Sequence, residues 1–183
     1  MTDDVDRVLE RDAAEKGIPV GTLLSTILRK YTDWDRLTEK YGFVSLPNTV
    51  LRSLLGEVDA DKITRIGKES GKSFKGRLLF WFKEANLESL IALILITYRY
   101  SGLARCEYQK FGDDYVITLK HELGRKWSIY TRELLRTALI EILAKTSESE
   151  ITDSSVMIRF SAPMLEVKRG HHAVSATAAE EEF

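Results

Sequence analysis

The period of the hydrophobic pattern changes within the second half of the chain, and this change constrains the fold more than any other feature. Residues 104–111 (ARCEYQKF) and 114–121 (DYVITLKH) alternate in polarity, as half-buried strands do. The Gly-Asp pair between them is typical of a two-residue hairpin turn. A helical apolar stripe follows over 125–144. The sequence therefore predicts a strand hairpin that leads into a helix.

Three flanking segments extend this unit. The apolar, aromatic-rich run 77–82 (RLLFWF) predicts a buried strand, although its pattern also fits a helix. Asn86 is a suitable cap for a helix over 87–101, and 154–160 alternates again. The order strand, helix, strand, strand, helix, strand predicts an α+β fold with a ferredoxin-like βαββαβ domain.

The N-terminal part is predicted to be helical. Apolar residues recur at helical spacing over 5–17 and again over 23–37. Pro47 suits the start of a third helix, and Asp59 is a good N-cap for a fourth. Gly67 and Gly71 are interpreted as breaks after it.

Composition limits the function classes. The formal net charge of the 183 residues is −1, so no global field draws the chain to nucleic acid or to an anionic membrane. The single cysteine, Cys106, excludes an internal disulfide and zinc sites built from several cysteines. The longest apolar run, 90–96 (LIALILI), is far shorter than the roughly 20 residues of a membrane span. We expect a cytoplasmic protein with no membrane partner.

One segment, 62–77, is locally basic, with six cations against one carboxylate. Runs of charge are usually solvated surface, and we interpret this one first as a solvated linker. The second interpretation is a nucleic-acid contact. Its candidate residues are Lys62, Arg65, Lys68, Lys72, Lys75 and Arg77.

The junction between the second strand and the long helix holds the candidate anion or effector site. Cys106 is predicted to lie diagonal to His121 on one face of the hairpin. A thiol and an imidazole are two metal ligands where three or four are needed, so no metal is predicted. Arg125 and Lys126 lie in a first helical turn, whose free N–H groups can hold an anion. The alternative is that both side chains reach into water and that Cys106 and His121 are core residues.

No catalytic motif is present in the sequence. No Ser/His/Asp triad can be argued, because His121 is the one histidine outside the C-terminal tail and no nucleophile motif flanks a serine. Glycine-rich phosphate loops and the H-E-x-x-H pattern are also absent. We therefore predict that the protein is not an enzyme and has no cofactor.

Residues 8–31 (VLERDAAEKGIPVGTLLSTILRKY) resemble the two-helix core of ribbon-helix-helix DNA-binding proteins. In that family two chains intertwine, and an N-terminal strand from each enters the DNA major groove. The resemblance implies a homodimer. Its core would contain Leu9, Ala13, Ile18, Leu23, Leu24, Ile27, Leu28 and Tyr31.

In the family, the N-terminus of the second helix also grips a DNA phosphate, and here both this part and the N-terminal strand depart from the pattern. Four residues, Met1 to Asp4, precede the first predicted helix, and Pro19 stands where the second helix usually begins with Ser or Thr. Residues 1–40 carry seven Lys or Arg and nine Asp or Glu, the wrong sign for gripping phosphate. Either the true start lies upstream, or the module dimerises without reading DNA.

A ribbon-helix-helix module followed by a βαββαβ domain resembles the layout of nickel-responsive repressors, whose second domain oligomerises and senses metal. The histidine-rich metal pattern of that group is absent here, so nickel is not implied. We predict a helical module at 1–40, a helical linker at 41–75, a ferredoxin-like domain at 76–162 and a disordered acidic tail at 163–183. The predicted function is a homodimeric, transcription-regulator-like protein that contacts double-stranded DNA. The alternative is a protein-interaction or ligand-sensing module that does not bind DNA.

Overall fold

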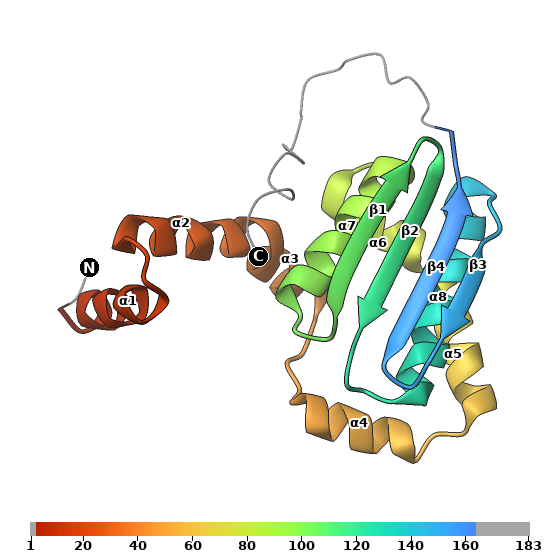
Figure 1. The fold of residues 1–183 in the computed structure, drawn as a ribbon, viewed down its shortest axis with the longest axis horizontal. Coiled ribbons are helices and arrows are strands. Elements are labelled where there is room, and N and C mark those ends of the chain that lie inside the picture. The colour runs from red at the N-terminus through yellow and green to blue at the C-terminus, as the bar shows by residue number, and fades with distance from the viewer. Residues whose placement is uncertain (1–2, 164–183) are drawn as a thin grey trace.

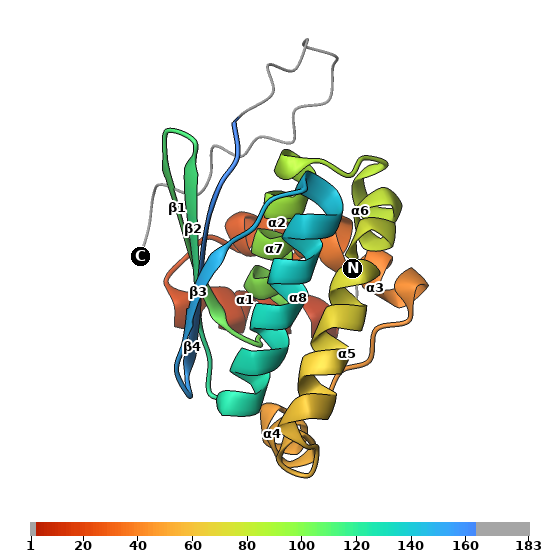
Figure 2. The same cartoon turned by 90° about the vertical axis from the view of Figure 1, so that its right-hand side faces the viewer.

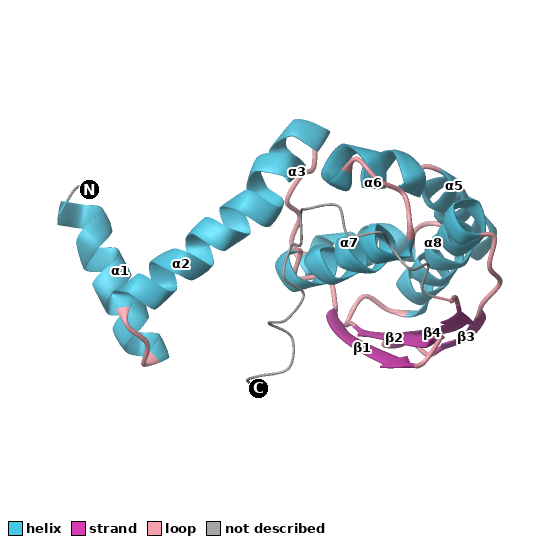
Figure 3. Ribbon diagram, turned by 90° about the horizontal axis from the view of Figure 1, so that it is seen from above, coloured by secondary structure: helices cyan, strands magenta, loops and turns pink. Residues whose placement is uncertain are grey.

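The computed structural model describes residues 3–163, and its N-terminal part is entirely helical. Helix α1 (Asp3–Lys16) turns back at Gly17, whose φ of +65° a residue with a side chain rarely adopts. Helix α2 (Val20–Lys30) continues without a break through the π-helical turn η1 (Tyr31–Asp35) into α3 (Arg36–Tyr41). The result is a short helix folded against a long rod (Figure 3).

Helices also fill the next stretch of chain. They are α4 (Asn48–Gly56), α5 (Ala60–Lys72), α6 (Phe74–Phe82) and α7 (Leu87–Tyr100). The predicted cap at Asn86 is confirmed. Its side chain accepts a hydrogen bond from the Ser89 backbone N–H at 2.9 Å, and the Ser89 hydroxyl accepts one from the Asn86 N–H at 3.0 Å. This reciprocal pair satisfies donors that the first helical turn leaves free.

The C-terminal part contains a four-stranded antiparallel sheet of order β1-β2-β4-β3 (Figure 1). Its elements are β1 (Arg105–Phe111), β2 (Asp114–Lys120), α8 (Arg125–Leu143), β3 (Glu148–Ile151) and β4 (Ser155–Ser161). The predicted hairpin is confirmed in its register, since Cys106 pairs with Leu119 across β1 and β2. The α+β class is thereby confirmed.

The helices cover one face of the sheet. Figures 2 and 3 show α7 and α8 against the sheet and α5 on the far side of α8. Alternate residues of β2 and β4 point into this layer, and the Tyr115 and Phe160 rings stack with centroids 5.2 Å apart. The buried strand residues are Tyr115, Ile117, Leu119, Val156, Ile158 and Phe160. They form one core with α7 and α8.

The predicted strand at 77–82 is wrong, because these residues lie in α6. Phe74 and Leu78 are both buried, and their spacing of four is helical. Because Phe74 lies outside the apolar run, the run alone did not reveal this period. The ferredoxin-like arrangement is therefore not confirmed: its first strand is a helix, and the short polar strand β3 (ESEI) was not predicted.

The predicted breaks at Gly67 and Gly71 are also wrong, because both residues are buried inside α5. The division of the chain into domains stays a prediction, and α5, assigned to the linker, packs against α8. Within residues 3–163 no helix is long and apolar enough to cross a bilayer. The predicted tail lies outside the described residues beyond Pro163.

Candidate functional site

The α1–α2 hairpin has a small internal core and exposed apolar residues around it. Leu9, Ala13 and Leu23 are buried, and Ile18 and Leu24 pack against them. The other predicted dimer residues face solvent: Ile27 is 46%, Leu28 61% and Tyr31 54% exposed. Val5 and Val8 of α1 are exposed as well. We call Val5, Val8, Ile27, Leu28 and Tyr31 the hairpin apolar set.

A cluster of aromatic rings joins the helical rod to α6. Trp34 lies with its ring centroid 5.5 Å from Phe43 and 6.3 Å from Trp81. The ring centroid of Tyr41 lies 5.3 Å from that of Phe80 and 5.4 Å from that of Trp81. Such pairs add about 0.5–1.5 kcal/mol each beyond the area they bury. We call α5–α8 and the four strands together the sheet domain, as a name for this part of the structure only. The aromatic joint fixes the rod to it through α6.

Of the six predicted nucleic-acid contacts, two interact with neighbouring residues of the protein and four are exposed without an ion pair to another described residue. Arg77 is half-buried, with its guanidinium 4.3 Å from the centre of the Phe74 ring and hydrogen-bonded to the Ser70 carbonyl at 3.2 Å. Lys62 pairs with Asp59 at 3.0 Å. The other four are exposed on α5 and α6, namely Arg65, Lys68, Lys72 and Lys75. Among the described residues none of these four makes an ion pair.

The glycines of α5 allow its backbone to approach α8 closely. A Cβ at Gly67 would lie 2.7 Å from the Tyr130 carbonyl oxygen, and one at Gly71 would lie 2.5 Å from the Thr137 Cβ. Real Cβ atoms do not approach this closely, so glycine is required at both positions. Two glycines four residues apart lie on one helical face, and this spacing, interpreted above as two helix breaks, could have indicated the contact.

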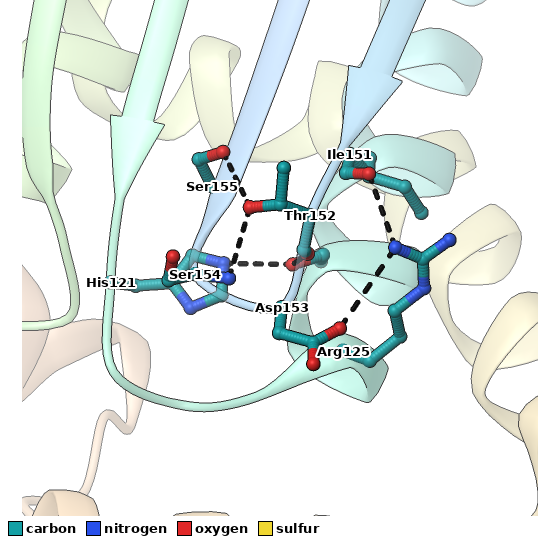
Figure 4. Close-up of polar contacts among 8 residues, drawn as sticks. His121, Arg125, Ile151, Thr152, Asp153, Ser154 and Ser155 are labelled. Carbon is teal, nitrogen blue, oxygen red and sulfur yellow. Dashed lines mark hydrogen bonds and ion pairs between the residues drawn. The ribbon is translucent and has the colours of Figure 1, made fainter.

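At the strand-to-helix junction His121 is a buried structural residue (Figure 4). Its Nδ1 accepts a hydrogen bond from the Leu123 N–H at 3.2 Å, which places the proton on Nε2. Nε2 donates to the Ser128 hydroxyl at 2.9 Å, and that hydroxyl donates to the Thr152 carbonyl at 2.7 Å. Burial lowers the pKa of His121 and keeps the ring neutral. Both ring nitrogens are used in holding the junction together.

Arg125 and Lys126 are also engaged in holding neighbouring segments. The Arg125 guanidinium donates to the Ile151 carbonyl at 3.2 Å and lies 3.9 Å from the Asp153 carboxylate (Figure 4). The Lys126 ammonium donates to the Gly56 carbonyl at 2.6 Å, at the C-terminal end of α4. A cation is favourable there because the last carbonyls of a helix carry partial negative charge.

Cys106 has a separate environment on β1. It packs against the sheet core, and burial raises the pKa of its thiol to about 12. The thiolate, which is the metal ligand and nucleophile, is therefore scarce at neutral pH. Within the described residues no group of three or more His, Cys, Asp or Glu side chains is placed to hold a metal. Each predicted effector residue makes a contact within the protein, and an effector site at these residues stays a prediction.

An open hollow of about 340 Å³ lies beside the start of α8. Its lining residues are Arg52, His121, Glu122, Gly124, Asp153 and Ser154. One guanidinium and two carboxylates offer mixed charge, and the buried imidazole is already hydrogen-bonded. The hollow therefore has no concentration of one charge sign for a phosphate or a cation.

Comparisons with known proteins give no family. No family model matches the sequence, and no curated protein matches it either. A solved structure of a doubly substituted H-NOX protein superposes over 93% of this chain and 78% of its own, at 13% identity and a TM-score of 0.40.

Proposed function

We propose that this protein is a homodimeric, transcription-regulator-like protein that dimerises through the α1–α2 hairpin and contacts double-stranded DNA. The observation that carries the proposal is the hairpin apolar set, which residues 3–163 leave exposed. The resemblance of residues 8–31 to the ribbon-helix-helix core points to the same region.

The occupant of this surface is a second copy of the chain. Isolated helices of about 12–15 residues are marginal in water, and α1, with 14 residues, packs against α2 through the small core of Leu9, Ala13 and Leu23. A two-fold dimer places the same apolar residues on both sides of the interface. Covering Leu28, the most exposed of the set, would give the hairpin the core that it lacks.

The DNA contact is assigned to α5, because the hairpin has the wrong charge. Asp3, Asp4 and Asp6 occupy the first turn of α1. Carboxylates there would repel phosphate, whereas Arg65, Lys68 and Lys72 are exposed on α5. The acidic α1 also favours the second candidate, an interaction module that dimerises but does not bind DNA.

The test of dimerisation is sedimentation equilibrium of the wild type and of Leu28→Glu. A glutamate at the centre of an apolar interface loses its hydration, so the variant should be monomeric where the wild type is dimeric. Phe111→Glu is the matched control, since Phe111 is 65% exposed at the distant β1–β2 turn. A monomeric wild type, or a dimer that Leu28→Glu leaves intact, would refute the hairpin interface.

The DNA contact is tested by fluorescence anisotropy of a labelled duplex at low and moderate salt. Binding that weakens steeply with salt supports the regulator, because phosphate contacts release counterions. A dimer that shows no binding at low salt would select the interaction module.

A further inference from the structure

Helices α5 and α8 run parallel, and their close contact sets which residues stand side by side. Gly67 faces Tyr130 and Glu133, whereas Gly71, one turn later, faces Leu134 and Thr137. The numbers rise together along both helices, and Figure 2 shows the two running in the same direction. The residues next to these contacts are therefore level as well. Lys68 stands level with Arg132, and Lys72 stands level with Arg136.

These two rows lie on the same side of the helix pair. Lys68 and Lys72 each follow a contact glycine by one residue, which turns them about 100° from the contact line. Arg132 and Arg136 each precede a contact residue of α8 by one, which turns them about 100° in the opposite sense. On two parallel helices that face each other, opposite rotations lead to the same side. Residues far apart in sequence thus form one surface.

The net charge of this surface is positive, although the exposed carboxylate of Glu69 lies on α5 near Arg65 and Lys72. Lys68, Lys72 and Arg136 are exposed and have no ion pair among the described residues. Arg132 is held by Glu133, with Nε 2.8 Å from Oε1. Arg65 is exposed one turn before Lys68. We call Arg65, Lys68, Lys72, Arg132 and Arg136 the α5–α8 basic face.

We propose that the α5–α8 basic face is a phosphate-backbone site for duplex DNA, and that Arg136 belongs to it. This inference rests on the proposed function and names the partner of its basic helix. Four residues of helix advance about 6 Å, and packed helices lie about 8–10 Å apart, so the face spans a few successive phosphates. Its five residues include no aromatic ring on which a single-stranded base could stack, which favours duplex over single strand.

The face is rigid, which suits it to this role. The glycine contacts fix α5 against α8, so the cations are held on one platform before any ligand binds. A preorganised site spends less free energy on ordering side chains when it binds. Since the contacts are to phosphate, binding should depend on salt and little on base sequence.

The test is anisotropy of a labelled duplex with the full chain, comparing wild type, Arg136→Ala and Lys68→Ala/Lys72→Ala. Each lost phosphate contact should weaken binding roughly eightfold at 0.1 M salt and reduce the slope of log K against log salt by about 0.9. Arg136→Lys should retain most of the affinity. Arg99→Ala is the control, because Arg99 is exposed at the end of α7, away from the face.

The outcomes separate this inference from the proposed function. If wild type binds and Arg136→Ala behaves like Arg99→Ala, the face is wrong while DNA binding stands. If wild type does not bind duplex at low salt, both the basic-face inference and the proposed DNA contact are refuted. Binding to vesicles with 30% phosphatidylserine but not to duplex would also overturn the inference, since the partner would then be a lipid surface.

Discussion

In the sheet domain, β2 and β4 place six side chains against α7 and α8 within one chain, and Leu78, Val156 and Ala138 are completely buried. In the α1–α2 hairpin, two helices of similar length bury Leu9, Ala13 and Leu23. Both regions have amphipathic elements with apolar faces. The sheet domain covers its faces by itself, whereas the hairpin leaves most of its apolar surface exposed.

This difference teaches how each region depends on its surroundings. A layered domain gains core in proportion to the faces that it brings together, and its stability is a property of the single chain. A two-helix hairpin has too few faces to cover, so its stability depends on what binds it. The following experiments test this contrast.

The largest expected effect comes from core truncation in the two regions. Ile117→Ala on β2 should lower the free energy of unfolding by about 2–5 kcal/mol, because a buried cavity remains. Its cost should not change with protein concentration. The cost of Leu23→Ala in the hairpin should instead shrink on dilution, because the part of the cost that reflects weaker binding of a second copy disappears as the dimer dissociates. Urea unfolding followed by circular dichroism at two protein concentrations measures the cost of each substitution. If the two costs depended equally on protein concentration, the contrast between the regions would be wrong.

A smaller effect is expected from filling the α5–α8 contact. Gly71→Ala should lower the free energy of unfolding by about 1–3 kcal/mol, because the new methyl group meets the Thr137 side chain and the Leu134 carbonyl. Gly76→Ala is its control in α6. No atom lies within 4 Å of a Cβ there, so alanine should stabilise by about 0.5–1 kcal/mol. A harmless Gly71→Ala in the same thermal unfolding series would show that the contact is loose.

A still smaller effect is expected where α8 holds α4. Lys126→Met removes the hydrogen bond to the Gly56 carbonyl and should cost about 0.5–1.5 kcal/mol. Since α4 has no buried residue, the loss should be local. Hydrogen exchange should show faster exchange in α4 and unchanged exchange in β2. Equal acceleration in both elements would mean that α4 is part of the global unfolding unit.

The smallest effect concerns pH and the junction at His121. Its folded-state pKa is lowered by burial, so between the unfolded and folded pKa values the unfolded state binds more protons. Stability from the neutral ring is complete above the unfolded pKa of about 6.5 and is lost as pH falls through the folded pKa. Protonation also removes the Nδ1 acceptor of the Leu123 N–H. His121→Gln should flatten the fall in unfolding free energy below pH 6.5, and an unchanged pH slope would exclude His121 as its source.

The sequence was most informative where one face of an element decides its pattern. The β1–β2 hairpin was predicted to its register, because polar and apolar residues alternate on both sides of a Gly-Asp turn. Helix α7 was predicted with its Asn86 cap. In both elements the turn or cap residues and the spacing of the buried apolar residues predict the same secondary structure.

The sequence was less informative where a distant segment decides. The run 77–82 is apolar throughout, and its helical period emerges only when Phe74 is included. Glycine often ends a helix, so Gly67 and Gly71 indicated breaks. In the structure they lie inside α5, where the absence of a side chain allows α8 to pack closely. Arg125 and Lys126 were predicted to hold an anion, and the sequence did not show that they donate hydrogen bonds to the carbonyls of Ile151 and Gly56, which lie elsewhere in the chain. Arg136 could not be predicted as part of a basic face, because its neighbour Lys72 is remote in sequence.

The aromatic joint gives the molecule an optical reporter of its own. Trp34 of the rod and Trp81 of α6 lie with ring centroids 6.3 Å apart, close enough for their electronic transitions to couple. The third tryptophan, Trp127, lies on α8 beside Tyr130. With Trp127 replaced by Phe, indole emission would come from the joint alone. Detachment of the rod from α6 would then be visible as a red shift of this emission without any attached dye, even while the sheet domain stays folded.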